Sequence, residues 1–155
     1  MDIKAGNPYP AGALSNFAPH SFVFRGVPCA SMEGWLQSLK FKGAEMQQHV
    51  CTLVGLKAKM TGKHKTWYKT QTLWWNGEPI KRDSQEYQDM LDEAYQAMFD
   101  QNEKARNALL ATQNAVLTHS IGKRKINETV LTEQEFCSRL TKNRARLKMS
   151  NFFGD

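Results

Sequence analysis

Two tight-turn signals constrain what this chain can fold into more than any other feature of its sequence. Arg25-Gly26 separates Phe22-Val23-Phe24 from Val27-Pro28-Cys29, and Asn76-Gly77 follows the aromatic run of residues 66–75. Glycine at the second position of a two-residue turn, between β-prone runs, predicts a tight hairpin. Both strand regions are short, so we expect a small antiparallel sheet rather than an extensive β structure.

Most of the remaining chain has the periodicity of helices. Ser31 is a candidate N-cap for a helix that runs to about Phe41, and a second helix is expected over residues 44–60. A further helix is expected over residues 104–112, and residues 115–120 could form a short strand. Helices therefore dominate the expected structure.

Two capping-box patterns predict where other helices begin. Asp83 is followed three residues later by Glu86, and Thr132 by Glu135. After the first pair, one helical face is apolar and is formed by Tyr87, Met90, Leu91, Ala94, Met98 and Phe99. A chain of 155 residues can bury one core without cross-links. We expect a single, helix-rich α+β domain over residues 1–155, with a small antiparallel sheet.

Basic residues are unevenly distributed along the chain, whose net charge is +6. Residues 1–82 carry eleven Lys or Arg against four acids, whereas residues 83–103 carry seven acids and no base. A basic surface attracts phosphate-bearing partners, either nucleotides or nucleic acid. A solvated lysine surface is the plainer interpretation for one group of residues, Lys57, Lys59, Lys63, Lys65 and Lys69.

Cysteine usage and the N-terminal residues bear on cofactors and location. Three widely spaced cysteines predict neither a disulfide framework nor a CxxC metal site. No His, Cys and Asp cluster has metal-ligand spacing, so no metal or other cofactor is expected. Residues 1–10 lack the apolar stretch of a signal peptide, and no apolar run approaches the roughly 20 residues of a membrane span. A cytoplasmic location without membrane contact is expected.

One carboxylate stands alone in the segment of residues 12–41. Glu33 is the only acid there, at the point where the predicted hairpin gives way to the predicted helix. The helix dipole favours an acid in a first turn by about 0.3–1 kcal/mol, which is a sufficient structural reason for it. The other interpretation is a reactive group whose pKa is raised by apolar neighbours such as Met32 and Trp35.

The same segment resembles the NADAR, or YbiA-like, family. The family motif is matched at fixed spacing by Gly12, Leu14, Ser15-Asn16-Phe17, Gly26, Glu33, Trp35, Gln37 and Lys40-Phe41. A second, weaker match lies in residues 94–112, at Phe99, Arg106 and Leu109-Leu110-Ala111-Thr112. The resemblance implies the NADAR fold and hydrolysis of the bond between ribose C1 and a nitrogen. The substrates it implies are ribosylamino-pyrimidine phosphates of riboflavin synthesis, or ADP-ribosylated guanine in nucleic acid.

The resemblance also implies roles for individual residues. Glu33 and Asn16 match catalytic positions, with Ser15 and Lys40 beside them as substrate contacts. Breaking an N-glycosidic bond builds oxocarbenium character on the sugar, which a carboxylate beneath C1 stabilises. The same carboxylate can take a proton from the attacking water. The Asn16 amide suits ribose hydroxyls or a base edge, although a turn-stabilising role is the alternative.

The chain departs from the family pattern in two places. Asp83 stands where the family has a catalytic tryptophan, and a family motif with an acid and Trp-Gly is replaced by residues 118–123. His119, in that replacement, is a candidate to protonate the leaving group, because imidazole exchanges protons near neutral pH. A purely structural histidine is the alternative. These departures indicate a divergent member with an altered substrate, or one that has lost activity.

Base and phosphate contacts can be proposed from residue types. On a strand Trp74 and Trp75 would point to opposite faces, so one could stack on a base while the other belongs to the core. Lys40, Arg82 and Arg106 are candidates for phosphate contact, or else surface ions. The leading hypothesis is a hydrolytic N-glycosidase. The alternatives are a non-catalytic module that binds ADP-ribose or nucleic acid, and an interaction protein that keeps only the fold.

Overall fold

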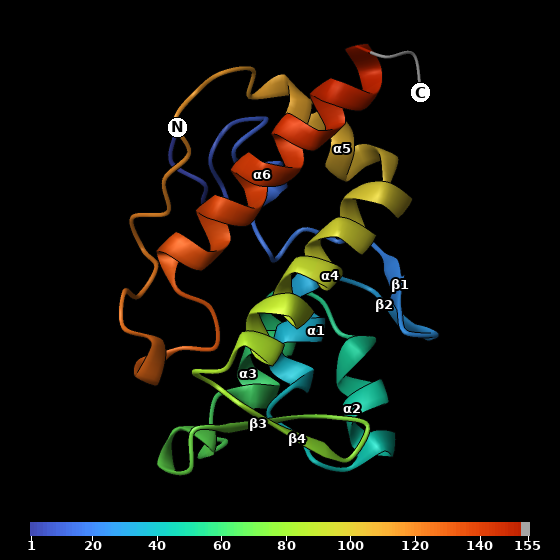
Figure 1. The fold of residues 1–155 in the computed structure, drawn as a ribbon, viewed down its shortest axis with the longest axis vertical. Coiled ribbons are helices and arrows are strands. Elements are labelled where there is room, and N and C mark those ends of the chain that lie inside the picture. Colours follow the sequence, from blue (N-terminus) through green and yellow to red (C-terminus); the bar gives the residue numbers. More distant parts are fainter. Residues whose placement is uncertain (153–155) are drawn as a thin grey trace.

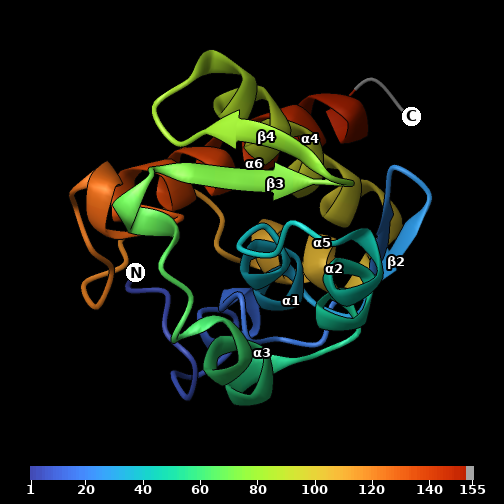
Figure 2. The same cartoon turned by 90° about the horizontal axis from the view of Figure 1, so that it is seen from below.

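Both predicted hairpins form, as two separate antiparallel sheets. The computed structural model describes residues 1–152. In this part of the chain β1 (Phe22–Phe24) pairs with β2 (Val27–Cys29), and β3 (Thr72–Trp75) pairs with β4 (Glu78–Lys81). The two hairpins lie at different edges of the molecule (Figures 1 and 2). Two-residue hairpin turns of type I′ have a positive φ at both central residues, and all four residues here have it: Arg25, Gly26, Asn76 and Gly77.

Six α-helices within residues 1–152 make up most of the structure, which is α+β as predicted. They are α1 (Met32–Ser38), α2 (Ala44–Cys51), α3 (Gly55–Gly62), α4 (Gln85–Gln101), α5 (Glu103–Ala111) and α6 (Glu133–Phe152). The long helices α4 and α6 contact each other across one face, and α1 packs between α4 and the pair α2 and α3 (Figure 1). No helix in the described part of the chain is long and apolar enough to cross a membrane.

The single helix expected over residues 44–60 is wrong, because two helices occupy that segment. α2 ends at Cys51, and α3 begins at Gly55, whose φ of 59° lies in the left-handed region that favours glycine. This turn lets both helices pack on α1. Leu53, between them, is buried and its carbonyl accepts a hydrogen bond from Ser31.

Of three further expectations, the structure corrects two and confirms one. Ser84, not Asp83, is the N-cap of α4, and its Oγ accepts a hydrogen bond from the Tyr87 N–H at 3.2 Å. The capping box of Thr132 and Glu135 is confirmed, with reciprocal bonds of 2.8 and 3.1 Å. The strand suggested for residues 115–120 is reduced to one parallel bridge between Asp2 and Thr118.

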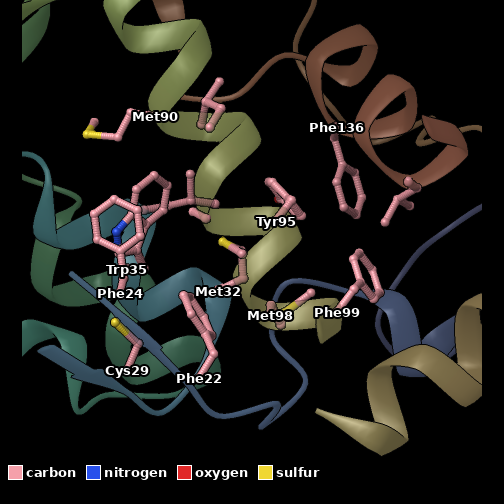
Figure 3. Packing of buried hydrophobic residues seen from close by; sticks show 14 of the residues in the cluster. Phe22, Phe24, Cys29, Met32, Trp35, Met90, Tyr95, Met98, Phe99 and Phe136 are labelled. Atoms are coloured by element: carbon pink, nitrogen blue, oxygen red, sulfur yellow. The ribbon is translucent and has the colours of Figure 1, made fainter. Parts of the chain in front are cut away.

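One aromatic cluster anchors α1 in the core. Phe24 lies edge-on to Trp35 with ring centroids 5.1 Å apart, and edge-on to Trp75 at 4.8 Å. Tyr95 reaches from α4 toward Phe136 of α6, whose ring centroid is 6.0 Å away. Figure 3 shows Phe24, Trp35 and Tyr95 around Met32, with Phe136 of α6 on the far side of Tyr95. The start of α1 is therefore fixed by packing on several sides.

Candidate functional site

Glu33 lies in the first turn of α1, and local hydrogen bonds hold that turn in place. The Ser31 Oγ accepts a hydrogen bond from the Gly34 N–H at 3.0 Å and donates one to the Leu53 carbonyl at 2.9 Å. The Glu33 N–H donates to the Asn16 carbonyl at 3.0 Å. This last bond makes Glu33 and Asn16 neighbours, because it ties the helix start to the loop that follows η1 (Gly12–Leu14).

The Glu33 carboxyl is buried, and burial disfavours its ionised form. Its residue is only 9% exposed, and burial raises the pKa of the carboxyl above its ordinary value. A long hydrogen bond of 3.5 Å from the Gln37 amide and the nearby positive charges of Lys40, Lys59 and His119 act in the opposite direction. Burial is the larger effect, so Glu33 is a stronger base than a solvated glutamate.

Tyr95 fixes the side chain of Asn16. The buried Tyr95 hydroxyl donates a hydrogen bond of 2.8 Å to the Asn16 Oδ1. Because the oxygen of the amide is engaged, the half-buried Asn16 has its Nδ2 group as the donor for a ligand. Burial, then the negative charge of Glu33, raises the pKa of Tyr95 well above its ordinary value, so the hydroxyl stays protonated and acts as a donor to Asn16. The sequence analysis missed Tyr95, since its position on α4 resembles that of an ordinary core residue.

His119 approaches the same site from the loop between α5 and α6. Its Nδ1 lies 2.6 Å from the Ile3 carbonyl oxygen, and its ring stands edge-on to Phe136 at 5.1 Å. A carbonyl oxygen only accepts hydrogen bonds, so Nδ1 carries a hydrogen and Nε2 is the ring nitrogen left for another partner. A Cβ at Gly122 would lie 2.6 Å from the His119 Cδ2, so the loop can close on the ring only with glycine there.

Three lysines from different segments bring positive charge to this region: Lys40 and Lys59 act on the Glu33 carboxyl, and Lys123 acts on Lys40. Lys40, just after α1, is half-buried, and its Nζ lies 3.4 Å from the Gly62 carbonyl oxygen. Burial lowers the pKa of Lys40; the charges of Lys123 and Lys59 also lower it, whereas Glu33 opposes the shift. Lys59 lies on α3 and Lys123 on the loop that carries His119. The site thus has one buried acid within a positively charged surround, which suits a substrate with phosphate groups.

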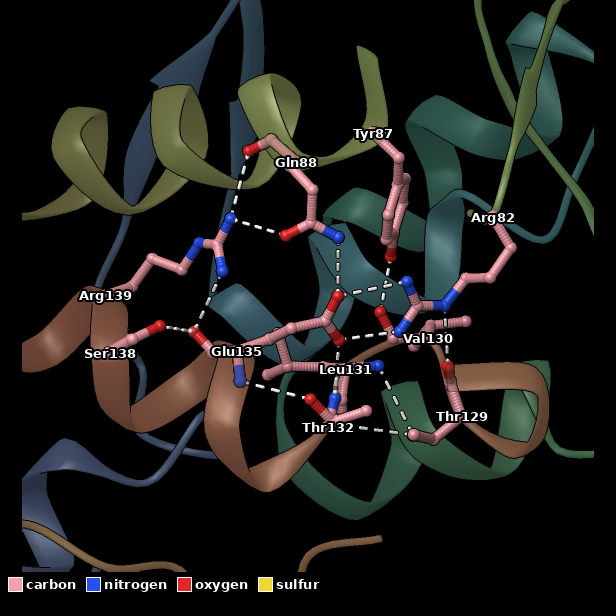
Figure 4. Close-up of polar contacts among 10 residues, drawn as sticks. All are labelled: Arg82, Tyr87, Gln88, Thr129, Val130, Leu131, Thr132, Glu135, Ser138 and Arg139. Atoms are coloured by element: carbon pink, nitrogen blue, oxygen red, sulfur yellow. Dashed lines mark hydrogen bonds and ion pairs between the residues drawn. The ribbon is translucent and has the colours of Figure 1, made fainter. Parts of the chain in front are cut away.

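Arg82 is not available as a phosphate contact, contrary to the sequence-based expectation. It is fully buried, and its guanidinium forms bonds of 2.6 and 3.1 Å to the two carboxylate oxygens of Glu135. Its Nε donates to the Thr129 carbonyl at 2.8 Å, and Gln88 donates to Glu135 at 2.7 Å (Figure 4). Arg82 therefore ties the end of β4 to the start of α6, and its role is structural.

The remaining candidates for substrate contact have different surroundings. Trp75 is buried against Phe24, so of the two tryptophans considered for base stacking it is the one that belongs to the core and is not available to a base. Trp74 points to the other face, is half-buried, and has the Lys42 Nζ 5.1 Å from its ring centroid. Arg106 donates from Nη1 to two carbonyls at the end of α4, and the Ser15 Oγ accepts from the Phe17 N–H at 3.2 Å.

Two hollows lie apart from Glu33. One of about 300 Å³ is lined by Leu117, Arg124, Glu133, Gln134 and Cys137. The other, of about 190 Å³, lies between β2, α2 and the second hairpin turn. Neither lining includes Glu33, Asn16 or His119, and we place the chemistry at the titratable cluster because reactive groups define a site better than volume does. Within the described residues, no three His, Cys, Asp or Glu side chains are arranged to hold a metal ion.

A solved structure that is similar to this chain shows which class of fold it has. The NMR structure of the E. coli protein YbiA superposes with a TM-score of 0.64, covering 98% of this chain and 89% of that chain at 17% sequence identity. The NADAR-like fold expected from the motif of residues 12–41 is therefore confirmed. At this identity the likeness establishes the fold alone.

The sequence then defines the family. Residues 8–145 match the family described as Bacteriophage protein GP30.3, and the chain belongs to this family. It is 38% identical over 141 residues to an uncharacterized 17.1 kDa protein in the Gp30-rIII intergenic region of Enterobacteria phage T4. That match covers 88% of this chain and 91% of the phage T4 protein.

Proposed function

We propose that this protein is an N-glycosidase that hydrolyses the C1–N bond of a phosphorylated ribosyl nitrogen compound. The substrate class is a ribosylamino-pyrimidine phosphate of riboflavin synthesis or an ADP-ribosylated guanine. The observation that carries the proposal is the buried Glu33, placed beside Asn16 and His119 within a surround of lysines. The NADAR-like fold supports it, because the motif that implies this chemistry lies on the segment that forms the site.

The residues of the site account for each part of the reaction. As the C1–N bond breaks, positive charge develops on the sugar, and the Glu33 carboxylate stabilises it. A water molecule forms the new bond to C1 and gives one proton to Glu33, whose raised pKa makes it a suitable base. The doubly protonated His119 ring donates a proton from Nε2 to the departing nitrogen. Glu33 then releases its proton to water and His119 takes one up, which restores the site. The products are the sugar with a hydroxyl at C1 and the free amine or base.

The neighbours of Glu33 and His119 bind and orient the substrate. The Asn16 Nδ2 group is positioned to donate to a ribose hydroxyl, since Tyr95 holds the other end of the amide. Lys40, Lys59 and Lys123 supply positive charge for the phosphate, and Trp74 offers a partly exposed ring for stacking. The hydrolysis uses water and the side chains of this chain alone.

The test is release of free base or amine, measured by mass spectrometry over a substrate panel. The panel holds ribosylamino-pyrimidine phosphates, NAD, ADP-ribose and ADP-ribosylated guanine in DNA and in RNA. We expect turnover of one class, reduced about 10²–10⁴-fold in Glu33→Gln, as for loss of a general base. Glu45→Gln is the matched control, because Glu45 is an exposed acid in the first turn of α2. Tight binding of ADP-ribose without turnover of any compound would replace the proposal with a non-catalytic binding module.

A further inference from the structure

A long basic segment lies outside the groups that the proposed reaction uses. Residues 46–77 contain five lysines and no acid. All five are exposed, on α3 and on the stretch that leads through η2 (Trp67–Lys69). Residues 123–125, Lys-Arg-Lys, form a second exposed basic run in the loop before η3 (Ile126–Glu128). Of the residues in these two runs, the proposed N-glycosidase chemistry needs only Lys59 and Lys123.

The fold brings the two basic runs together on one side of the molecule. Lys59 and Lys123 both lie close enough to Lys40 to lower its pKa. The Gln71 side chain, just after η2, donates a hydrogen bond of 3.0 Å to the Asn127 carbonyl in η3. Figure 2 shows the green segment that follows α3 at the bottom of the molecule and leads to the left side, where the orange segment near residue 126 lies. We call Lys59, Lys65, Lys69, Lys123 and Lys125 the basic rim.

An exposed aromatic ring lies within the basic rim. Tyr68 is 51% exposed, whereas its neighbour Trp67 is buried and stands edge-on to it at 6.4 Å. Lys69 follows Tyr68 directly, and Lys65 is held by a contact of 4.8 Å between its Nζ and the Phe41 ring centroid. Lysines alone would attract any polyanion. A base-stacking surface between lysines instead favours single-stranded nucleic acid, whose bases are unpaired and free to stack.

We propose that the basic rim is a binding surface for single-stranded nucleic acid. The strand lies along α3, η2 and the loop of residues 120–127, with its phosphates on the lysines and one base on Tyr68. Charge complementarity selects a phosphate backbone, and the exposed Tyr68 ring selects the single strand over the duplex. This surface extends beyond the proposed catalytic groups, and binding to it does not require the reaction at Glu33.

The test is the fluorescence anisotropy of a short labelled single-stranded oligonucleotide, titrated with protein at several salt concentrations. For single strands the slope of log affinity against log salt becomes less steep by about 0.7 for each phosphate that the protein ceases to neutralise, so Lys65→Gln/Lys69→Gln should reduce it by about 1.4. We expect this double variant to bind about tenfold more weakly. The matched control is Lys104→Gln/Lys142→Gln, which removes the same charge from exposed sites on α5 and α6 and should change affinity less than about threefold.

Tyr68→Ala separates base stacking from simple charge attraction. It should weaken binding of the normal strand about tenfold and leave binding of an abasic strand unchanged. Any of three results would overturn the inference. The two double variants could bind equally weakly, Tyr68→Ala could weaken both strands equally, or the duplex could bind as tightly as the single strand. Turnover of a small glycosidase substrate should persist in Lys65→Gln/Lys69→Gln, so failure here is distinguishable from failure of the proposed function.

Discussion

The Glu33 carboxyl occupies a position that does not favour its ionised form. Burial raises its pKa, and the hydrogen bond from Gln37 and the charges of Lys40, Lys59 and His119 only partly offset that effect. An exposed first-turn acid such as Glu45 would satisfy the helix dipole equally well without this cost. A residue retained at a cost to stability is common at functional sites, where activity and stability compete.

Replacing Glu33 by glutamine should stabilise the protein at neutral pH. Because the folded-state pKa is raised, the wild-type carboxyl is neutral and harmless below about pH 4.5, its ordinary value. As pH rises from there toward the raised pKa, Glu33 ionises in the unfolded chain but stays protonated in the folded one, and this difference costs stability that neutral glutamine does not lose. We expect Glu33→Gln to have a melting temperature equal to that of the wild type at low pH and higher by a few degrees at pH 7. Thermal unfolding followed by circular dichroism across this range measures the difference. A Glu33→Gln protein that melts below the wild type at neutral pH would show that attraction to the lysines outweighs burial.

Removing Arg82 should be severely destabilising, because it leaves Glu135 buried without its main partner. Burial opposes ionisation of Glu135, but hydrogen bonds from Arg82 and Gln88 outweigh it and lower its pKa. Loss of one member of a buried pair costs about 3–5 kcal/mol, so Arg82→Met should lower the free energy of unfolding by about that amount at pH 7. The cost should shrink as pH falls through the pKa of Glu135, since the protonated acid needs no counter-charge.

Urea denaturation measures this destabilisation, and the double variant Arg82→Met/Glu135→Met provides the control. It removes both charges and should recover at least half of the stability that Arg82→Met forfeits, because apolar residues of similar volume can replace a buried ion pair. A double variant no more stable than Arg82→Met would show that the other contacts of Glu135, to Gln88 and the Thr132 N–H, carry the stability instead.

The residue scale also shows where sequence reasoning fails. Arg82 and Trp75 were considered for substrate contact, yet one is in a buried ion pair and the other is in the aromatic core. A cation or an indole has the same local sequence signal whether it faces solvent or the interior. Only the packing of α6 on β4 and of β1 on β3 decides between these outcomes, and residues from distant parts of the chain supply that packing.

At the scale of elements, α1 is the helix on which the site depends. It has only seven residues, too short to be stable alone, so its cap and its packing determine whether it forms. Ser31 makes two buried hydrogen bonds, one to the helix and one to the Leu53 carbonyl between α2 and α3. The start of α1 and the break between α2 and α3 therefore stabilise each other.

Ser31→Ala should lower both stability and activity, whereas a cap elsewhere should affect stability alone. Loss of an N-cap costs about 0.5–2 kcal/mol, and we expect the upper part of this range because Leu53 also loses its donor. Ser84→Ala is the matched control, since Ser84 caps α4 and donates to the Lys81 carbonyl at 2.6 Å. Urea denaturation and the glycosidase assay are run on both variants. Equal activity in the two would show that the cap of α1 does not position Glu33.

Local signals predicted some elements and missed others for identifiable reasons. Both hairpins follow from two-residue turns, which are determined by the residues within them. The break after α2 depends on Gly55, whose left-handed conformation is used here to fold two short helices onto α1. A glycine within an amphipathic run can also lie inside a continuous helix, so the sequence does not predict the break. The cap of α4 was misplaced by one residue because Asp83 and Ser84 are both good capping residues.

At the scale of the whole molecule, the site exists only because distant segments converge. It combines Asn16 from a loop, Glu33 and Lys40 from α1 and its end, Tyr95 from α4, and His119 from the loop before α6. The motif of residues 12–41 supplied Glu33 and Asn16, and their roles remain predictions. Tyr95, Lys59 and Lys123 could not be identified from the sequence, because no short-range pattern indicates that they lie near Asn16, Glu33 or Lys40.

The central claim is that this chain hydrolyses a C1–N glycosidic bond through Glu33. The most direct measurement is a reaction of the turned-over compound in water enriched in heavy oxygen, followed by mass spectrometry of both products. The account predicts heavy oxygen in the sugar product, none in the released base, and loss of the signal in Glu33→Gln but not in Glu45→Gln. Heavy oxygen in the base or in free phosphate would contradict the claim, as would undiminished release by Glu33→Gln.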